Sequence, residues 1–123
     1  MNLFLAPLVV LVVEDTVLIR MGIVETLQDA GCETMEADGG VEALSLVTQR
    51  SDICVLFSNV GAPGPHDGLE LARQVHAIEP HIQLILTSGR GAPADADMPP
   101  GAWFVPKPYS AIDLTRRISS IRG

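Results

Sequence analysis

Five short apolar runs alternate along the chain with segments of helical periodicity, and this alternation restricts the fold more than any other feature. The runs cover residues 8–13, 32–37, 53–57, 82–87 and 102–105. Several of them are apolar at consecutive positions, which is typical of strands buried on both faces of a parallel sheet. Strands that alternate with helices predict an α/β protein, with a doubly wound five-stranded parallel sheet and flanking helices.

The segments between the runs carry apolar residues at intervals of three and four, as amphipathic helices do. They cover residues 17–30, 40–49 and 68–78, and a last helix begins at Ser110. Ser110 and Asp113 have the spacing of a capping box, in which each side chain bonds the backbone N–H of the other residue. Residues 89–101 contain three prolines and three glycines, so we expect no helix longer than about two turns there.

Length and charge limit the classes of function. The 123 residues suffice for a single domain with one core, and we expect residues 1–6 to be a short extension and no output domain to be present. A net charge of −7 argues against nucleic acid as a partner. The apolar N-terminal run is too short to span a membrane and no basic residue precedes Arg20, so we expect a cytoplasmic protein. Cys32 and Cys54 lack metal-ligand spacing and are interpreted as free thiols.

Polar side chains stand where the predicted strands end. The first strand is followed by Glu14 and Asp15, and the third is followed by Asn59. The fourth strand ends in Thr87, and the fifth is followed by Lys107, the only lysine of the chain. In the order 2-1-3-4-5 these four strands are neighbours, and ligands of such sheets bind outside the carboxyl ends of the strands. Two carboxylates, an amide, a hydroxyl and an ammonium predict a site for a hard cation and an oxyanion.

Five motifs carry a resemblance to a known family. They are "VVEDT", "GGVEAL", "SNVGAP", "ILTSG" and "VPKPY". With these motifs nearly the whole chain resembles the receiver domains of two-component response regulators. The resemblance implies a flavodoxin-like fold and a role in a phosphorelay, where a phosphoryl group passes from a phosphohistidine to an aspartate at the end of the third strand. It implies a signalling module and not an enzyme.

Residue by residue, the resemblance assigns metal ligands, groups that take phosphate oxygens, and switch residues. The metal ligands are Glu14, Asp15 and the backbone carbonyl of Gly61. The groups that take phosphate oxygens are Thr87 and Lys107, and the switch residues are Thr87 and Phe104.

The position that corresponds to the phosphate acceptor carries Asn59. An amide oxygen is neutral and its electron density is delocalised toward nitrogen, so we expect no acyl phosphate there. The metal also loses an anionic ligand, so we expect Mg²⁺ to bind weakly or not at all. The amide NH₂ is free to donate to Glu14 or Asp15. These residues predict a pseudo-receiver, which keeps the surroundings of the site and lacks its nucleophile.

Three functional interpretations follow. The first is a phosphorylation-independent receiver that acts through protein–protein docking at the fifth strand and its flanking helices. Its partners would be a histidine kinase, a phosphotransfer protein or a downstream effector, and a homodimer is left open. The second is a receiver regulated by a noncovalent ligand or by another acceptor residue. The third, a small flavodoxin-like enzyme or ligand-binding protein, is the weakest because the chain has neither a nucleophile–base pair nor a nucleotide-binding loop.

Overall fold

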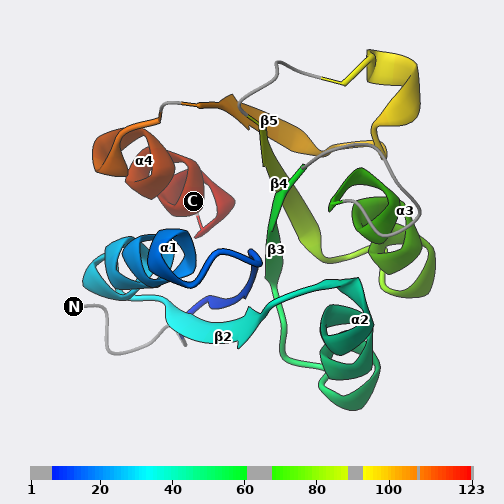
Figure 1. Ribbon diagram of the computed structural model, residues 1–123, viewed down its shortest axis with the longest axis horizontal. Coiled ribbons are helices and arrows are strands. Elements are labelled where there is room, and N and C mark those ends of the chain that lie inside the picture. Colours follow the sequence, from blue (N-terminus) through cyan, green and yellow to red (C-terminus); the bar gives the residue numbers. More distant parts are fainter. Residues whose placement is uncertain (1–6, 61–67, 89–92, 108, 123) are drawn as a thin grey trace.

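The computed structural model describes residues 7–60, 68–88, 93–107 and 109–122 (Figure 1). Within these residues, one sheet of five strands forms the centre of the domain. The strands are β1 (Val9–Val13), β2 (Glu33–Ala37), β3 (Val55–Asn59), β4 (Gln83–Ser88) and β5 (Trp103–Pro106). Their order is β2-β1-β3-β4-β5, and every neighbouring pair is parallel. The predicted fold class and strand order are confirmed.

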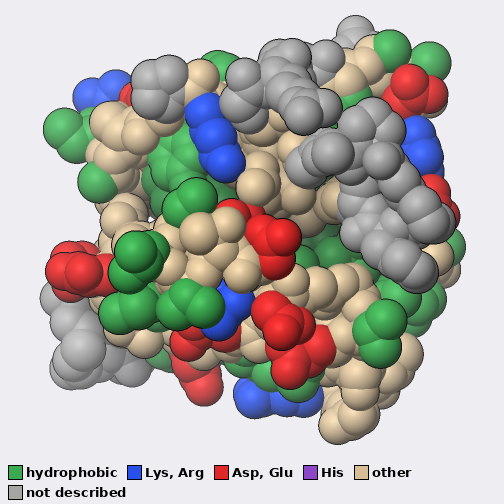
Figure 2. All heavy atoms as spheres, viewed as in Figure 1, with side chains coloured by type: hydrophobic (Ala, Val, Ile, Leu, Met, Phe, Trp, Pro, Cys, Tyr) green, Lys and Arg blue, Asp and Glu red, His purple; other side chains and the backbone are tan. Residues whose placement is uncertain are grey.

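Four α-helices of the described residues cover the sheet as two layers. They are α1 (Val17–Asp29), α2 (Gly40–Gln49), α3 (Gly68–Ile78) and α4 (Ala111–Arg122). Figure 1 shows α1 and α4 on one face of the sheet and α2 and α3 on the other. In Figure 2, which shows the same side, acidic and basic side chains lie near the middle, between the two helix pairs. None of the helices in the described part combines the length and the apolar character of a membrane span.

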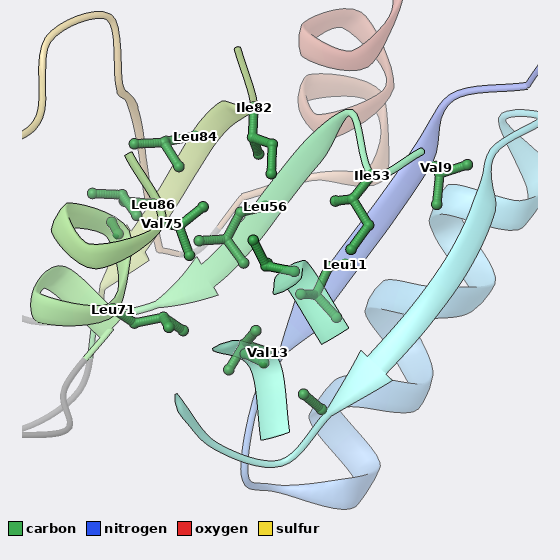
Figure 3. Packing of buried hydrophobic residues seen from close by; sticks show 14 residues of the cluster. Val9, Leu11, Val13, Ile53, Leu56, Leu71, Val75, Ile82, Leu84 and Leu86 are labelled. Carbon is green, nitrogen blue, oxygen red and sulfur yellow. The ribbon is translucent and has the colours of Figure 1, made fainter. Parts of the chain in front are cut away.

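The hydrophobic core has two layers, one on each face of the sheet. Successive residues of a strand point to opposite faces, so sequence neighbours enter different layers. The layer under α2 and α3 includes Leu11, Leu56, Leu71, Val75, Leu84 and Leu86 (Figure 3). The layer under α1 and α4 includes Val10, Val12, Leu27, Phe57, Ile85 and Leu114. Full burial of one such side chain contributes about 1.5–3 kcal/mol. Burial on both faces explains why β1, β3 and β4 carry consecutive apolar residues, whereas the edge strand β2 carries exposed polar residues.

The third strand lies two residues later than the sequence pattern predicts. The apolar run predicts 53–57, whereas β3 covers Val55–Asn59. Ser58 is fully buried, and Asn59 still pairs with Thr87 of β4. The polar character of Ser58 and Asn59 suggested the start of a loop. Pairing with the neighbouring strand keeps both residues in the sheet, because it satisfies their backbone groups.

Residues 89–92 of the connection from β4 to β5 lie outside the described residues, and the rest of this connection is irregular. Its described residues, 93–102, contain a single 3₁₀ turn at Asp95–Asp97, which confirms that no long helix forms there. Arg73 of α3 donates from Nε to the carbonyl oxygen of Asp97 at 2.9 Å. This bond fastens the turn to α3.

Helix α4 begins with the predicted capping box. The backbone N–H of Asp113 donates to Ser110 Oγ at 3.0 Å, and the backbone N–H of Ser110 donates to Asp113 Oδ2 at 3.4 Å. These bonds satisfy backbone donors that have no partner within the helix.

The substitution Ser110→Ala should lower the free energy of unfolding by about 1 kcal/mol, because the first turn of α4 loses its cap. Urea denaturation followed by circular dichroism measures this change. Ser119→Ala is the matched control, since Ser119 is exposed on the same helix and alanine is the better helix former. An equal loss in the two variants would contradict the role of the cap.

Candidate functional site

Four polar side chains lie at the carboxyl end of the layer between the sheet and the α1–α4 pair. Asn59 and Thr87 are paired neighbours in β3 and β4, whereas Glu14 and Lys107 directly follow β1 and β5. The residues two positions before them belong to the core under α1 and α4, and they are Val12, Phe57, Ile85 and Val105. Because side chains alternate along a strand, this apolar layer ends in the four polar groups.

Asn59 links Glu14 to Lys107 through its side-chain amide. Its Nδ2 donates to Glu14 Oε2 at 2.8 Å, and its Oδ1 accepts a hydrogen bond from Lys107 Nζ at 3.2 Å. The chemistry dictates this orientation, because a carboxylate only accepts and an ammonium only donates. Glu14 is 3% exposed, so its buried carboxylate gains a donor that it needs. Of the two carboxylates that the sequence offers to this amide, the structure selects Glu14.

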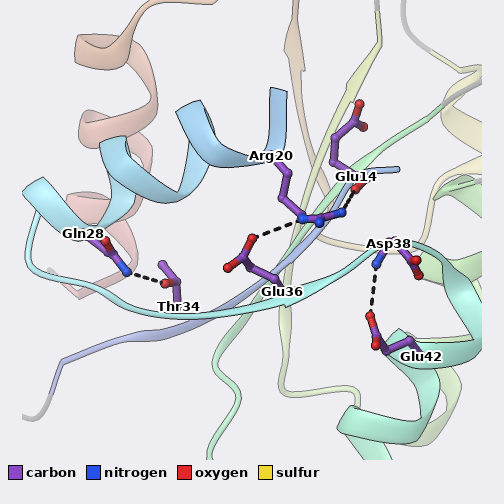
Figure 4. Close-up of polar contacts among 7 residues, drawn as sticks. All are labelled: Glu14, Arg20, Gln28, Thr34, Glu36, Asp38 and Glu42. Carbon is purple, nitrogen blue, oxygen red and sulfur yellow. Dashed lines mark hydrogen bonds and ion pairs between the residues drawn. The ribbon is translucent and has the colours of Figure 1, made fainter. Parts of the chain in front are cut away.

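The main chain of Glu14 is held by the two neighbouring elements (Figure 4). Its N–H donates to the carbonyl oxygen of Ala37 in β2 at 3.2 Å. Its carbonyl oxygen accepts a hydrogen bond from Arg20 Nη1 of α1 at 2.7 Å, and Arg20 Nε forms an ion pair with Glu36 at 3.1 Å. No motif or spacing in the sequence indicated a role for Arg20 in the site. The structure shows it as a positioning residue, because it fixes the strand end that carries Glu14.

The hydroxyl of Thr87 is fully buried beside this chain of hydrogen bonds. Within the described residues, Thr87 Oγ1 has no hydrogen-bond partner. A buried hydroxyl without a partner is destabilising by about 1–3 kcal/mol. The register of the sheet places Thr87 opposite Asn59, so this donor lies where a ligand oxygen at the site could use it.

The other predicted site residues are not joined to this group. Asp15 is exposed, and within the described residues its carboxylate makes one long contact, to Thr16 Oγ1 at 3.5 Å. Phe104 is half-buried and packs against the core layer under α2 and α3, on the opposite face of the sheet. Gly61 lies outside the described residues.

The described residues do not fit a Mg²⁺ ion as they are arranged. Among them, no group of three or more histidine, cysteine, aspartate or glutamate side chains is placed to hold a metal. Glu14 accepts from the amide, and the oxygen of Asn59 faces the ammonium of Lys107. Mg²⁺ requires several oxygen ligands in near-octahedral geometry, and a cation does not share an oxygen favourably with an adjacent ammonium.

Tyr109 is a further residue of the site that sequence analysis did not identify. Its ring is half-buried and meets Phe57 edge to face, with ring centroids 6.0 Å apart and planes at 69°. Burial raises the pKa of the Tyr109 phenol, and the negative charge of Glu14 raises that pKa further. Its position two residues after Lys107 is the only indication in the sequence that Tyr109 lies at the same end of the sheet.

Helix α3 begins against the end of β3, and glycine is required at the contact. A Cβ atom on Gly68 would lie 2.3 Å from the backbone oxygen of Asn59 and 2.6 Å from Ser58 Oγ. Real Cβ atoms do not approach other atoms so closely, so the absence of a side chain lets α3 and the site strand meet.

The sequence profile of the family described as "Response regulator receiver domain" matches residues 10–119. The chain belongs to the response regulator receiver family. This receiver domain is 30% identical to the response regulator receiver protein CpdR of Brucella abortus over 115 residues, which cover 91% of this chain and 94% of that protein. It is 35% identical to the sensor kinase CckA of the same species over 120 residues, which cover 91% of this chain and 12% of the kinase.

Solved receiver structures have the same fold. A receiver domain protein from Clostridium thermocellum matches with a TM-score of 0.80 and 28% identity, over 93% of both chains. The chemotaxis protein CheY4 of Vibrio cholerae matches with a TM-score of 0.80 and 25% identity, over 94% of this chain and 99% of that one. The protein is therefore a receiver domain of the two-component type.

The substitution Gly68→Ala should lower the free energy of unfolding by about 1–3 kcal/mol, because the new methyl group overlaps the backbone of Asn59. The matched control is Gly22→Ala inside α1, where a Cβ would meet nothing within 4 Å. That change should raise the free energy of unfolding by about 0.5–1 kcal/mol. Urea denaturation compares the two, and a stabilised Gly68→Ala variant would rule out the close contact.

Tyr109 is the only tyrosine, so phenolate absorbance reports its ionisation alone. We expect an apparent pKa above the ordinary value of about 10. Glu14→Gln should lower the pKa of Tyr109 only part of the way toward the ordinary value, because the burial of the ring remains. The control Glu33→Gln, at the exposed start of β2, should leave the pKa of Tyr109 unchanged.

The sign of the pH dependence follows from the same raised pKa. The stabilisation from neutral Tyr109 is complete below the pKa of the unfolded state and is lost as the pH rises through the folded-state pKa. Urea denaturation at increasing alkaline pH should therefore show a steeper loss of stability in the wild type than in Tyr109→Phe.

Proposed function

We propose that this receiver domain signals through protein docking, without phosphoryl transfer to residue 59. The observation that carries the proposal is the hydrogen-bonded chain in which Asn59 joins Glu14 to Lys107. By the family resemblance, residue 59 stands where receivers carry the phosphate acceptor. Here that position holds an amide, and both ends of the amide are engaged.

The amide removes the nucleophile that phosphoryl transfer needs. A carboxylate attacks phosphorus with a full negative charge shared by two oxygens. The oxygen of Asn59 is neutral, and it already accepts a hydrogen bond from Lys107. The side chain of Asn59 can therefore not form a mixed anhydride with phosphate.

The amide also stabilises the site without a metal. An aspartate at position 59 would place a second negative charge against the buried carboxylate of Glu14, where Nδ2 now donates. Two unit charges about 4 Å apart repel each other by roughly 4 kcal/mol at an effective dielectric of 20. Asn59 replaces this repulsion by a hydrogen bond, so the site needs no cation to hold it together.

We infer from this that Mg²⁺ binds weakly or not at all. Receiver domains commonly bind Mg²⁺ at the phosphorylation site, where clustered carboxylates attract it. In this chain Glu14 is engaged, Asp15 is exposed, and the oxygen of Asn59 faces an ammonium.

The partners of this function are other signalling proteins. Receiver domains interact with histidine kinases, phosphotransfer proteins or effectors, and the CckA match places a similar segment within a sensor kinase. We propose that this chain docks on such a partner through β5 and α4. The folded domain would then be competent to bind its partner without a phosphoryl group.

One observation supports a second candidate, a receiver regulated by a noncovalent oxyanion. Thr87 Oγ1 is buried without a partner among the described residues, and Lys107 supplies a positive charge at the same end of the sheet. Such a ligand would raise the melting temperature of the wild type without changing its covalent mass.

The decisive experiment compares wild type, Asn59→Asp and Asn59→Glu after incubation with acetyl phosphate and Mg²⁺, by intact mass spectrometry. We expect a phosphate-sized increase in mass for Asn59→Asp alone. Asn59→Glu is the matched control, because it carries the same charge one methylene further from the strand. Without Mg²⁺, Asn59→Asp should also be less stable than the wild type by roughly 1–3 kcal/mol, and Mg²⁺ should restore part of this loss.

The other outcomes separate the alternatives. Labelling of the wild type at the rate of Asn59→Asp would show another acceptor residue and would refute the proposal. Thermal stabilisation of the wild type by acetyl phosphate, with unchanged mass, would favour the noncovalent candidate.

A further inference from the structure

The outer edge of β5 and the adjacent face of α4 enclose a hollow of about 480 Å³. One wall is the segment Phe104–Pro106, and the other is a helical stripe that carries Asp113, Arg116, Arg117 and Ser120. The stripe follows the spacing of one helix face, and β5 is the last strand of the sheet order. The volume lies in the range of pockets that hold a small ligand or several side chains of a peptide.

The charge of this hollow is opposite to that of the chain. The net charge is −7, yet the hollow presents Arg116 and Arg117 side by side. Three other described arginines form ion pairs with carboxylates, and they are Arg20, Arg50 and Arg73. Within the described residues, Arg116 and Arg117 form none. Arg116 and Arg117 are exposed and not engaged in an ion pair with another described residue, so their guanidinium groups are available to an anion from outside the described chain.

Neighbouring side chains shape this positive charge. The guanidinium of Arg117 lies over the ring of Trp103, 5.1 Å from its centroid, and such stacking contributes about 0.5–1 kcal/mol at exposed sites. The carboxylate of Asp113 accepts from the backbone of Ser110 in the capping box, so it is directed at the start of the helix. The stacked guanidinium is thus held at the hollow, while Asp113, the carboxylate among the lining residues, bonds the backbone of Ser110.

We propose that this hollow binds an acidic segment of a partner protein, whose carboxylates pair with Arg116 and Arg117. The proposal rests on the proposed function of docking and adds the chemistry of the partner. The guanidinium fork binds carboxylates in a bidentate manner, and the segment Phe104–Pro106 of β5 forms the opposite wall of the hollow. A short segment with few carboxylates meets the local positive charge, whereas a long polyanion such as nucleic acid meets the repulsion of the whole chain.

The hollow also adjoins the polar site described above. Tyr109 lines it, and the same residue lines a second hollow with Lys107 and Leu18 of α1. A segment bound between β5 and α4 therefore lies beside Tyr109, a residue whose pKa is affected by the charge of Glu14. Trp103 is the only tryptophan of the chain, and the guanidinium of Arg117 lies over its ring, so a ligand that moves Arg117 should change the tryptophan fluorescence.

Two short fluorescein-labelled peptides test the proposal. One alternates glutamate with leucine, and its twin has glutamine in place of every glutamate. Fluorescence anisotropy with the full chain should show binding of the glutamate peptide, weakened by added salt, and no comparable binding of the twin. Arg116→Gln and Arg117→Gln should each weaken binding about two- to five-fold, as expected for exposed charge pairs. Arg50→Gln, the charge-matched control after α2, should leave binding unchanged.

Each remaining outcome decides against the proposal. Equal binding of the two peptides, equal effects of Arg116→Gln and Arg50→Gln, or no binding by folded wild type would overturn it. Concentration-dependent self-association that Arg116→Gln abolishes would assign the hollow to a second copy of this chain. If the peptide does not bind and mass spectrometry finds no phosphorylation of the wild type, the acidic-segment proposal fails while the proposed function stands. Conversely, phosphorylation of the wild type leaves the peptide result unaffected, so the two failures are distinguishable.

Discussion

Burial of the parallel sheet on both faces is the constraint on which the rest of the molecule depends. The inner strands, covered by helix pairs on each side, are apolar at consecutive positions, because their successive side chains enter one core layer and then the other. Polar side chains therefore gather where the strands leave the core. The group of Glu14, Asn59, Thr87 and Lys107 lies at this end because the layer of Val12, Phe57, Ile85 and Val105 stops there.

The amide of Asn59 supplies both a hydrogen-bond donor and an acceptor at this polar end, whereas a carboxylate supplies only acceptors. It offers a donor to Glu14 and an acceptor to Lys107, so each charged neighbour has a partner of the right kind. Arg20 holds the strand end that carries Glu14 in place. An amide has nearly the volume of a carboxylate, but its nitrogen is a hydrogen-bond donor that a carboxylate lacks.

The surface next to β5 carries local positive charge, whereas the chain as a whole is acidic. The turn at Asp95–Asp97 is fastened to α3 by Arg73, and α4 is fixed at its start by its capping box. Arg116 and Arg117 stand on the exposed face of that helix, over the edge strand. This positively charged edge of the sheet, held by these bonds, is consistent with a domain that docks on its partners without a change of conformation.

The sequence by itself determined the class of fold, the bounds of the helices to within about one residue, and the position of each polar residue at a strand end. Periodicity suffices for these features because backbone hydrogen bonding and burial act on short segments. It also predicted that the amide of residue 59 would meet a carboxylate. It could not choose between Glu14 and Asp15, because that choice depends on which way the chain turns after β1.

Only the tertiary structure decided which of the candidate groups touch. Asp15 turned out to be exposed, and β3 extended through Asn59 because β4 continues to pair with it. The roles of Arg20, Gly68 and Tyr109 arise from contacts between elements far apart in the chain, as does the stacking of Arg117 on Trp103. Such contacts depend on the packing of α1, α3 and α4 against the sheet, and local sequence patterns contain no information on distances between elements.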